Sequence, residues 1–394
     1  MSSNNRILYS CQVPSIMNRG AGKLTGAGQV GGMVHGVQSI GITTNFNLEQ
    51  AFELGQIEIF ENIEGTPDVE VTMEKFIDGY PLMYLLASTG VAGTNASGLV
   101  ARSKERCDVN LGIFGEEFNN VAAATANGGD AEVQVYMSGM YISSISYSIP
   151  VDGTCTESIT LVGNSKEWLT GTDTSMESES VVSFDGLDEP LAFGVTNAPS
   201  GGLQRREDVM LEHCVLPAAI QGANGSGIGN PYNAVSAGQA LTASGLGVHV
   251  QSVSVSTDFS REDVLELGKK LPFYRPAAFP IEVSCEIEAI TTSGDFVTAL
   301  ELGDPNLWSG KASGNNTSEE NIFFALRGGV TIDVGAKNRL ASVSYGGADA
   351  TGGNASCTYS YTNFNDLDVK QVGHNVPSTM GFQDSSLVVL YGTD

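Results

Sequence analysis

The chain has 394 residues and a net charge of −26, from 19 Lys and Arg against 45 Asp and Glu. Such an acidic field repels phosphate, which argues against specific nucleic-acid binding. The N-terminus has no apolar core of signal-peptide length, and the longest clean apolar run, residues 80–87, is too short to span a bilayer. We therefore expect a soluble protein, assembled in a cytoplasm, with no membrane partner.

One segment near the N-terminus recurs 213 residues later. VQSIGITTNFNLEQAFELG, residues 37–55, and VQSVSVSTDFSREDVLELG, residues 250–268, agree at nine of nineteen positions. The likeness extends outward, from residues 7–16 and 210–219 to SISY at 144–147 and SVSY at 342–345. Periodicity of this kind predicts a tandem duplication. We place the two domains at residues 1–204 and 205–394, because Pro and Gly interrupt any pattern near the junction.

Finer pairings between the copies follow from the same comparison. With a one-residue gap, Glu70 stands opposite Glu282, and Met73 stands opposite Cys285. Cys155 stands opposite Cys357 if the second copy carries four extra residues. A position that accepts either Cys or Met is typical of an apolar core, and no C-x-x-C or zinc-type spacing occurs.

Each copy begins with alternating segments that predict half-buried strands. In residues 37–44 and 250–257, Ile or Val alternates with Ser, Gly or Thr. In residues 69–74 and 281–288, apolar residues alternate with Glu, Ser or Thr, so the polar face is acidic in both copies. A connection of about two dozen residues, containing an ELG turn, lies between the two strands. It is too long for a tight hairpin loop.

One short helix is expected after the second strand of each copy. In the first copy Asp78 is the expected N-cap, with Pro81 in the first turn; in the second, Ser293 is the cap of a helix that contains Val297. Alternating segments then return. The predicted fold is mainly β: two tandem β-sandwiches or partly open barrels, each with one short α-helix.

Motifs for chemistry are weak throughout. GAGQVG at 26–31 satisfies G-x-G-x-x-G, but a strand follows it where a helix N-terminus is required. GAGKLTG at 20–26 has Leu after the Lys, where a P-loop needs Ser or Thr. Four scattered His residues form no catalytic or metal spacing. Glu70 with Glu74 is more typical of a solvated sheet face than of an acid/base pair. We expect no enzyme activity, no catalytic, cofactor or metal site, and no cofactor.

Two stretches carry a family resemblance. VQSVSVSTDFSREDVLELGKKLPFYRPAAFPIEVSCEIE at 250–288, with its weaker first copy, resembles the core hairpin of tail tube proteins (major tail proteins) of long-tailed bacteriophages. ISSISYSIPVDGTCTESITLVGNSKEW at 142–168 resembles later strands of that family. The likeness covers about half of each copy.

The resemblance implies a structural virion protein that self-assembles. In the family, six tube domains form a ring, rings stack into a tube, and double-stranded DNA passes through the lumen. A chain with two such domains would need three copies, which makes a homotrimer with pseudo-hexameric symmetry. Its other partners would be tail proteins at the tube ends, and it would reside in the virion tail after assembly in the host cytoplasm.

The resemblance also gives the polar strand faces a role. They would line an acidic lumen with few cations to hold phosphate, so that the genome slides through during ejection. The residues expected to face the lumen are Glu70, Thr72, Glu74, Glu282, Ser284, Glu286, Glu288, Ser39, Thr43, Ser252, Ser254 and Ser256. The glycine-rich runs at 18–36 and 221–247 would be arms that order on stacking or, equally, surface linkers.

Two other classes stay open. Another self-assembling protein, such as a baseplate ring, a tail terminator or a surface-layer module, would share the duplicated sandwiches and form isolated rings or sheets instead of long hollow tubes. A secreted carbohydrate-binding or hydrolytic β-sandwich is disfavoured, because the chain has no signal-type segment and only two Trp residues, Trp168 and Trp308, to form aromatic platforms.

Overall fold

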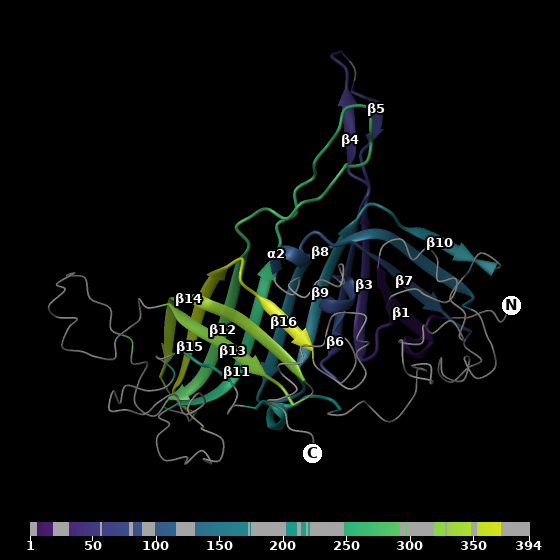
Figure 1. Ribbon diagram of the computed structural model, residues 1–394. Helices are drawn as coiled ribbons and strands as arrows, with labels where there is room; N and C mark the ends of the chain where they lie inside the picture. Colours follow the sequence, from purple (N-terminus) through teal and green to yellow (C-terminus); the bar gives the residue numbers. More distant parts are fainter. Residues whose placement is uncertain are drawn as a thin grey trace.

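The computed structural model describes residues 6–18, 31–55, 57–78, 82–88, 99–115, 131–171, 174, 202–210, 214–217, 220, 248–291, 297, 319–327, 329–347 and 353–371. The chain is mainly β, as the sequence predicts (Figure 1). In these ranges a 14-stranded antiparallel sheet contains every strand except β4 and β5, which form a separate hairpin. The bounds of the strands are β1 Gln12–Asn18, β2 Gly31–Met33, β3 Val37–Asn45, β4 Leu48–Phe52, β5 Ile59–Glu64, β6 Asp68–Phe76, β7 Cys107–Ile113, β8 Val133–Pro150, β9 Thr156–Gly163, β10 Glu167–Thr170, β11 Val248–Asp258, β12 Glu282–Thr291, β13 Glu320–Ala325, β14 Val330–Gly346, β15 Ser356–Phe364 and β16 Asp368–Gln371.

Eight strands form one continuous layer, which we call the main sheet. Their order is β3-β6-β9-β8-β11-β12-β15-β14. Four strands from the first half of the sequence are followed by four from the second half in the same relative order. The two sets join where β8 pairs with β11. Because β8 of the first half pairs with β11 of the second, the joint is a heterologous, head-to-tail contact and not one made about a two-fold axis.

Register within the main sheet gives the equivalence of the two halves directly. Ser39 pairs with Glu74 in the first half, and Ser252 pairs with Glu288 at the matching place in the second. Glu74 is therefore the equivalent of Glu288, so the expected pairing of Glu70 with Glu282 is wrong by two residues. Thr156 and Ser356 likewise hold matching places, which makes Cys357 the equivalent of Glu157 and not of Cys155.

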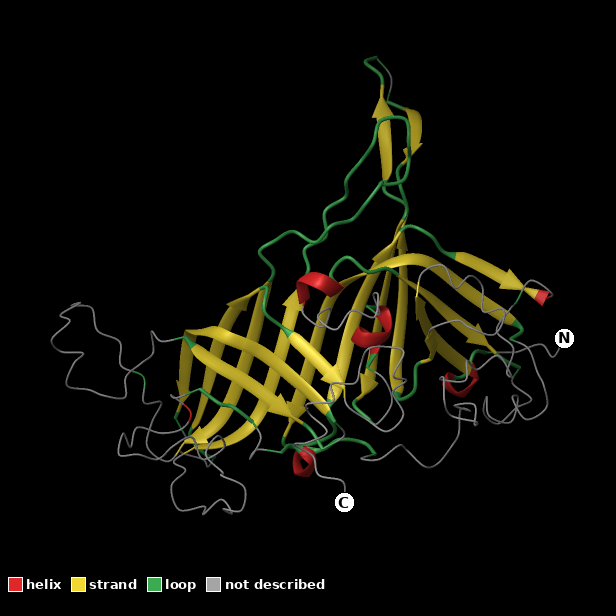
Figure 2. Ribbon diagram, in the orientation of Figure 1, coloured by secondary structure: helices red, strands yellow, loops and turns green. Residues whose placement is uncertain are grey.

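The long strands β8 and β14 connect two layers. The first part of β8 pairs with β7 and β10, and its later part pairs with β9 and β11. β14 does the same with β13 and β16, then with β15. Each strand has a register shift at the change of partner, at Ile142/Ser144 and at Leu340/Ser342. Such bulges bend a strand, and here they fold each sheet back over its own apolar face (Figure 2).

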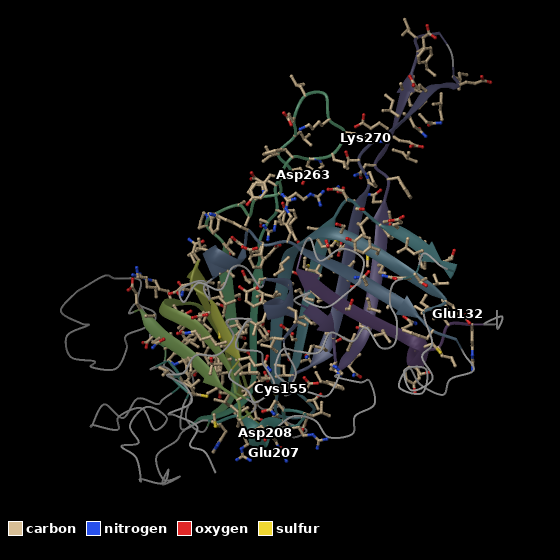
Figure 3. All side chains as sticks on the ribbon, turned by 45° about the vertical axis from the view of Figure 1, so that its right-hand side comes forward. Glu132, Cys155, Glu207, Asp208, Asp263 and Lys270 are labelled. Carbon is tan, nitrogen blue, oxygen red and sulfur yellow. The ribbon has the colours of Figure 1, made fainter. Side chains whose placement is uncertain are left out.

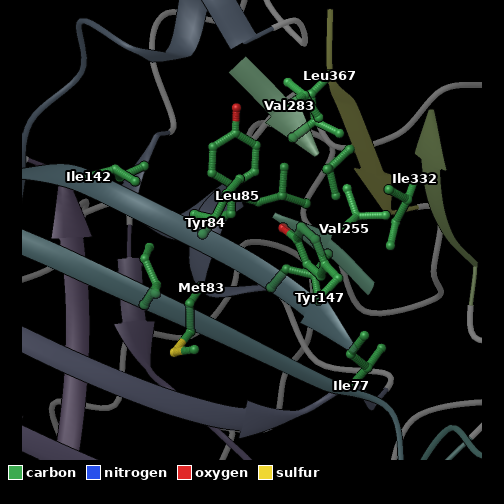
Figure 4. Packing of buried hydrophobic residues seen from close by; sticks show 14 of the residues in the cluster. Ile77, Met83, Tyr84, Leu85, Ile142, Tyr147, Val255, Val283, Ile332 and Leu367 are labelled. Carbon is green, nitrogen blue, oxygen red and sulfur yellow. The ribbon is translucent and has the colours of Figure 1, made fainter. Parts of the chain in front are cut away.

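The core lies on the apolar face of the main sheet. Alternate residues of each strand point into it, such as Val283 on β12 and Val255 on β11, while helix α1, Met83–Ala87, packs against the same region through Tyr84 and Leu85 (Figure 4). All six cysteines are buried and none forms a disulfide. Burial raises the pKa of the Cys155 and Cys285 thiols to about 12. The prediction that Cys residues occupy the core is confirmed.

A charged cluster is buried beneath α1, and it explains why the expected helix cap is wrong. Asp78 does not cap the helix; its Oδ1 accepts from the fully buried Nζ of Lys75 at 3.2 Å. Leu82 is the N-cap residue, with no side-chain cap. Instead the carboxylate of Glu157, from the neighbouring β9, accepts from the N–H groups of Met83 (2.6 Å) and Tyr84 (3.0 Å). The tertiary contact satisfies donors that a local cap would otherwise satisfy.

Other sequence expectations fall partly outside the described residues. A second short helix, α2, spans Leu99–Arg102 and also belongs to the first half. The helix expected from Ser293 lies outside the described residues except for Val297, as do residues 20–26 and most of GAGQVG. Most of both glycine-rich runs also lie outside them. No helix in the described ranges has both the length and the apolar composition needed to cross a membrane.

His35 gives the fold a pH dependence. Burial, and the nearby positive charge of Lys75, lower the pKa of His35 from 6.5 to about 4. The unfolded chain therefore binds a proton more tightly than the folded chain between these pH values. The stability contributed by neutral His35 is complete above pH 6.5 and is lost as the pH falls toward 4.

We expect His35→Gln to remove part of this acid sensitivity. The measurement is the thermal unfolding midpoint at pH 7.5 and at pH 4.5 for both proteins. The drop between the two pH values should be smaller in the variant, because glutamine does not titrate. An equal drop would contradict the assignment of the effect to His35.

Candidate functional site

The candidate functional site is the solvent-facing side of the main sheet together with its two outer edges. Along β6 the residues alternate strictly, with Val69, Val71 and Met73 buried and Glu70 and Thr72 exposed. The same alternation runs through β9 and β15, where the outward positions carry mainly Ser and Thr. The result is a continuous polar face, which we call the hydroxyl-carboxylate face.

All twelve residues expected on one polar face are exposed or half-buried on the main sheet. Register brings them together in rows across strands. In one row Ser254 faces Glu286, which faces Ser360; in another Ser252 faces Glu288. Long hydrogen bonds join Ser252 Oγ to Glu288 Oε2 (3.3 Å) and Ser360 Oγ to Glu286 Oε1 (3.5 Å).

The charges on this face have one sign over most of its area. Carboxylates come from the acidic strands β6 and β12, and the strands between them contribute hydroxyl groups. Arg339 on the outer strand β14 lies in register with Thr362 and pairs with Glu319 at 3.5 Å. Within the described ranges, no group of three or more His, Cys, Asp or Glu side chains could hold a metal ion. The face offers repulsion to an anion and hydrogen bonding to water.

Within the part of the chain that the structure describes, each end of the main sheet is an open strand edge. Among the described residues, β3 has a hydrogen-bonded neighbour only on its β6 side. The last part of β14, residues 342–346, has β15 as its one partner among the described strands. Unpaired edges are normally blunted or paired, because they present a row of free N–H and C=O groups. The two edges are complementary, because β3 and β14 are the equivalents of β11 and β8, which pair with each other. Their exposure on one chain requires an explanation.

Exposed apolar side chains mark both edges, and the internal joint shows what would cover them. Phe259 lies at the β8·β11 joint and is 0% exposed, while its equivalent at the free edge, Phe46, is 61% exposed. Tyr147 on β8 is 1% exposed, while its equivalent on β14, Tyr345, is 53% exposed. The same positions are buried where a neighbouring half is present and open where it is not.

Two arms leave one end of the main sheet. The first arm, residues 46–67, contains the β4–β5 hairpin, and the second arm, residues 259–281, follows β11 (Figure 1). Thr66 Oγ1 donates to the carbonyl of Lys270 at 2.5 Å, and Arg275 pairs with both Asp68 (2.6 Å) and Asp263. These contacts hold the base of the first arm against the second arm.

Sequence reasoning missed the two edges and the projection of the arms. The repeat itself held a signal for the edges, since matching Phe46 to Phe259 identifies equivalent positions before their exposure is known. Alternation of polar and apolar residues shows which face of a strand is buried. It does not show whether the strand lies inside the sheet or at its edge, because that depends on which strands it pairs with.

No family model and no curated protein matches the sequence. Among solved structures, the chain is similar to the tube terminating cap of the anti-feeding prophage, with 14% identity over 43% of this chain and 95% of that chain and a TM-score of 0.29. It is also similar to a chain of the PVC sheath-tube complex of an extracellular contractile injection system in the extended state, with 8% identity, 43% and 95% coverage and a TM-score of 0.29. A chain of the anti-feeding prophage baseplate has 8% identity over 42% of this chain and 96% of that chain, with a TM-score of 0.29. Likeness at this level says nothing about activity or partners.

Proposed function

We propose that this chain is a structural subunit of a tail tube, in which three copies close a ring with pseudo-hexameric symmetry. The observation that carries the proposal is that the main sheet ends in β3 and β14, the equivalents of the strands β11 and β8 that pair with each other at the internal joint. Residues 1–204 and 205–394 would be the two copies of one tube domain. The described strands of each copy supply four strands to the main sheet.

The internal joint serves as a template for the joint between chains. In it Val255 pairs with Tyr147, and Ser256 pairs with Ser146. Transferring this register through the equivalence of the halves places Ile42 of one chain opposite Tyr345 of the next. Thr43 then lies opposite Ser344, and both exposed aromatic positions, Phe46 and Tyr345, become covered. Burying such side chains favours association by about 1.5–3 kcal/mol each.

Closure of the ring follows from the head-to-tail order. Heterologous contacts of this kind form rings when the rotation closes. Three chains would join three times eight strands, 24, into one barrel. Barrels of about 16–18 strands already leave an aqueous channel, so this barrel would be open. It would have no exposed sheet edge.

The hydroxyl-carboxylate face would line that channel, with the residues named as lumen-facing in the sequence. Carboxylates on β6 and β12 would repeat around the wall and repel a nucleic-acid backbone over the ~8 Å Debye length. Ser and Thr hydroxyls keep the wall hydrated. Double-stranded DNA would therefore pass during ejection without being held, in the tail of a virion assembled in the host cytoplasm.

The joint between chains can be tested by a cysteine pair. Thr43→Cys with Ser344→Cys should cross-link neighbouring chains under mild oxidation, because directly opposed residues lie within disulfide range. Reducing-sensitive two- and three-chain bands on denaturing gels are the expected result. The six native cysteines are buried, so they should contribute little background.

Two matched variants make the result decisive. Ser146→Cys with Ser256→Cys places the two cysteines opposite each other at the internal joint of one chain. This pair should form a disulfide within the chain and join no chains together. Thr43→Cys with Ser342→Cys is two residues out of register, where the separation is about 7–8 Å, and should not cross-link. The proposed register would be ruled out if the Thr43/Ser342 pair cross-linked. It would also be ruled out if the Thr43/Ser344 pair did not. Isolated rings without tubes would favour a terminator, baseplate or surface-layer role.

A further inference from the structure

Aromatic rings and a guanidinium group hold the two halves together at the end of the internal joint, where the second arm begins. Asp263 and Lys270 lie on this arm (Figure 3). The Cζ atom of Arg261 lies 5.2 Å from the ring centroid of Phe259 and 5.1 Å from that of Tyr141 on β8. Because Tyr141 belongs to the first half and the other two residues to the second, these contacts cross the joint.

Tyr141 is the centre of this cluster. Its ring meets the ring of Tyr274, from the second arm, edge to face with 6.1 Å between centroids. The Cζ atom of Arg106, from the same half as Tyr141, lies 4.9 Å from the Tyr141 centroid. Tyr141 is 4% exposed. Aromatic pairs and cation–π contacts add to what burial alone contributes, so this ring is a strong contact between the halves.

The free edge on β14 carries a cation at the matching place. Val162 and Thr362 hold equivalent positions on β9 and β15, and they pair with Tyr141 and Arg339 respectively. Arg339 is therefore the equivalent of Tyr141. Its side chain is 63% exposed, and its ion pair with Glu319 spans 3.5 Å. Ion pairs as exposed as this one contribute little to stability, so the Arg339 guanidinium can take a second carboxylate.

The first arm carries a carboxylate at the place of Tyr274. Ala51 and Val264 are matched by the sequence repeat. Ala51 pairs with Glu61 in the first arm, and Val264 pairs with Tyr274 in the second, so Glu61 is the equivalent of Tyr274. Glu61 is exposed and forms no ion pair with another described residue. The two tyrosines that meet at the internal joint are thus replaced by an arginine on one free edge and a glutamate beside the other.

We propose that Arg339 of one chain forms an ion pair with Glu61 of the neighbouring chain in the same ring. This ion pair would take the place that the tyrosine pair has at the internal joint. Leu48, the equivalent of Arg261, and Phe46 would cover it, and exclusion of water strengthens the attraction between opposite charges. The inference rests on the proposed ring and names the polar contact between its chains.

The exchange of residue types makes the two free edges specific for each other. Two β14 edges in contact would bring two copies of Arg339 and no Glu61. Two β3 edges in contact would bring two copies of Glu61 and no Arg339. Opposite charges meet when β14 contacts β3, and that is the head-to-tail order that closes a ring.

Charge reversal tests the pair. Arg339→Glu and Glu61→Arg should each raise the concentration at which half of the chains are in rings at least about tenfold, because each brings like charges together. The double variant restores opposite charges and should return this concentration to within about threefold of the wild-type value. Native mass spectrometry of a dilution series is the measurement. Lys337→Glu, the same charge change at another exposed residue of β14, is the control and should leave the concentration unchanged.

Copying the internal pair into the joint between chains gives a second test. Arg339→Tyr with Glu61→Tyr should still form rings, because the two rings can pack as Tyr141 and Tyr274 do. The net charge is unchanged, so repulsion between the acidic chains is common to this variant and the wild type. Added salt should therefore weaken wild-type rings relative to rings of the tyrosine variant, since it screens the ion pair alone of the two contacts.

The outcomes separate this inference from the proposed function. Wild-type rings with normal ring formation by both single reversals would overturn the ion pair and leave the ring proposal standing. A double variant no better than the single ones would do the same. A wild-type chain that forms no ring would overturn both proposals.

Discussion

Replacing Glu157 with glutamine is expected to destabilise the folded chain by about 3–5 kcal/mol, the usual cost of breaking a buried charged cluster. Its carboxylate accepts from two backbone N–H groups of α1 and from the Tyr147 hydroxyl (3.1 Å). Burial raises the pKa of this carboxyl, while the charge of Lys75 and the two N–H groups oppose the rise. A glutamine amide would present N–H to other donors and would leave the Lys75 charge less compensated.

The measurement is urea unfolding followed by circular dichroism, with Glu167→Gln as the control. Glu167 is exposed on β10, so its replacement should change the unfolding free energy by no more than about 0.5 kcal/mol. Lys75→Met combined with Glu157→Gln should cost at least about 1 kcal/mol less than the sum of the single changes, because the two side chains interact. Additive costs would mean that they do not.

The triple substitution of Glu282, Glu286 and Glu288 by lysine is expected to leave assembly intact. It should impair DNA passage at least about tenfold, because each lysine can form a charge-assisted contact with phosphate. These side chains lie outside the core, and their bonds to Ser252 and Ser360 are long. The substitutions should therefore change the free energy of unfolding only slightly. The expected effect is on function alone.

Binding of a DNA duplex to assembled tubes separates the outcomes. Assembled tubes of the Lys variant should bind a short DNA duplex at low salt and release it as salt rises, whereas wild-type tubes should not bind it. The same positions changed to Gln should give intermediate behaviour, because the repulsion is removed without adding cations. Failure of the Lys variant to form rings would show that this face is an interface and not a channel wall.

Much of the main sheet could be predicted from the sequence, because alternation and internal repetition both act over short distances. The strand faces and the mainly β fold follow from period two. The residue-by-residue equivalence of the two copies could not be predicted from this alternation. A shift of two residues leaves every side chain on the same face, so Glu70 can be matched to Glu282 or to Ser284 with no change in polarity.

The charged cluster was less predictable, although its signal is visible. Lys75 and Glu157 occupy positions that alternation assigns to the apolar face of β6 and β9. Their equivalents in the second half are Ala289 and Cys357, so the cluster is particular to the first half. A charge on an apolar face indicates a buried partner, but the partner came from a strand that is distant in sequence.

The central claim is that three copies close the ring, and the mass of a single ring tests it most directly. Native mass spectrometry of single rings should give three chains of 41.2 kDa, about 124 kDa. A ring of six copies, about 247 kDa, would require the joint between chains to differ from the internal β8·β11 joint, and would contradict the account.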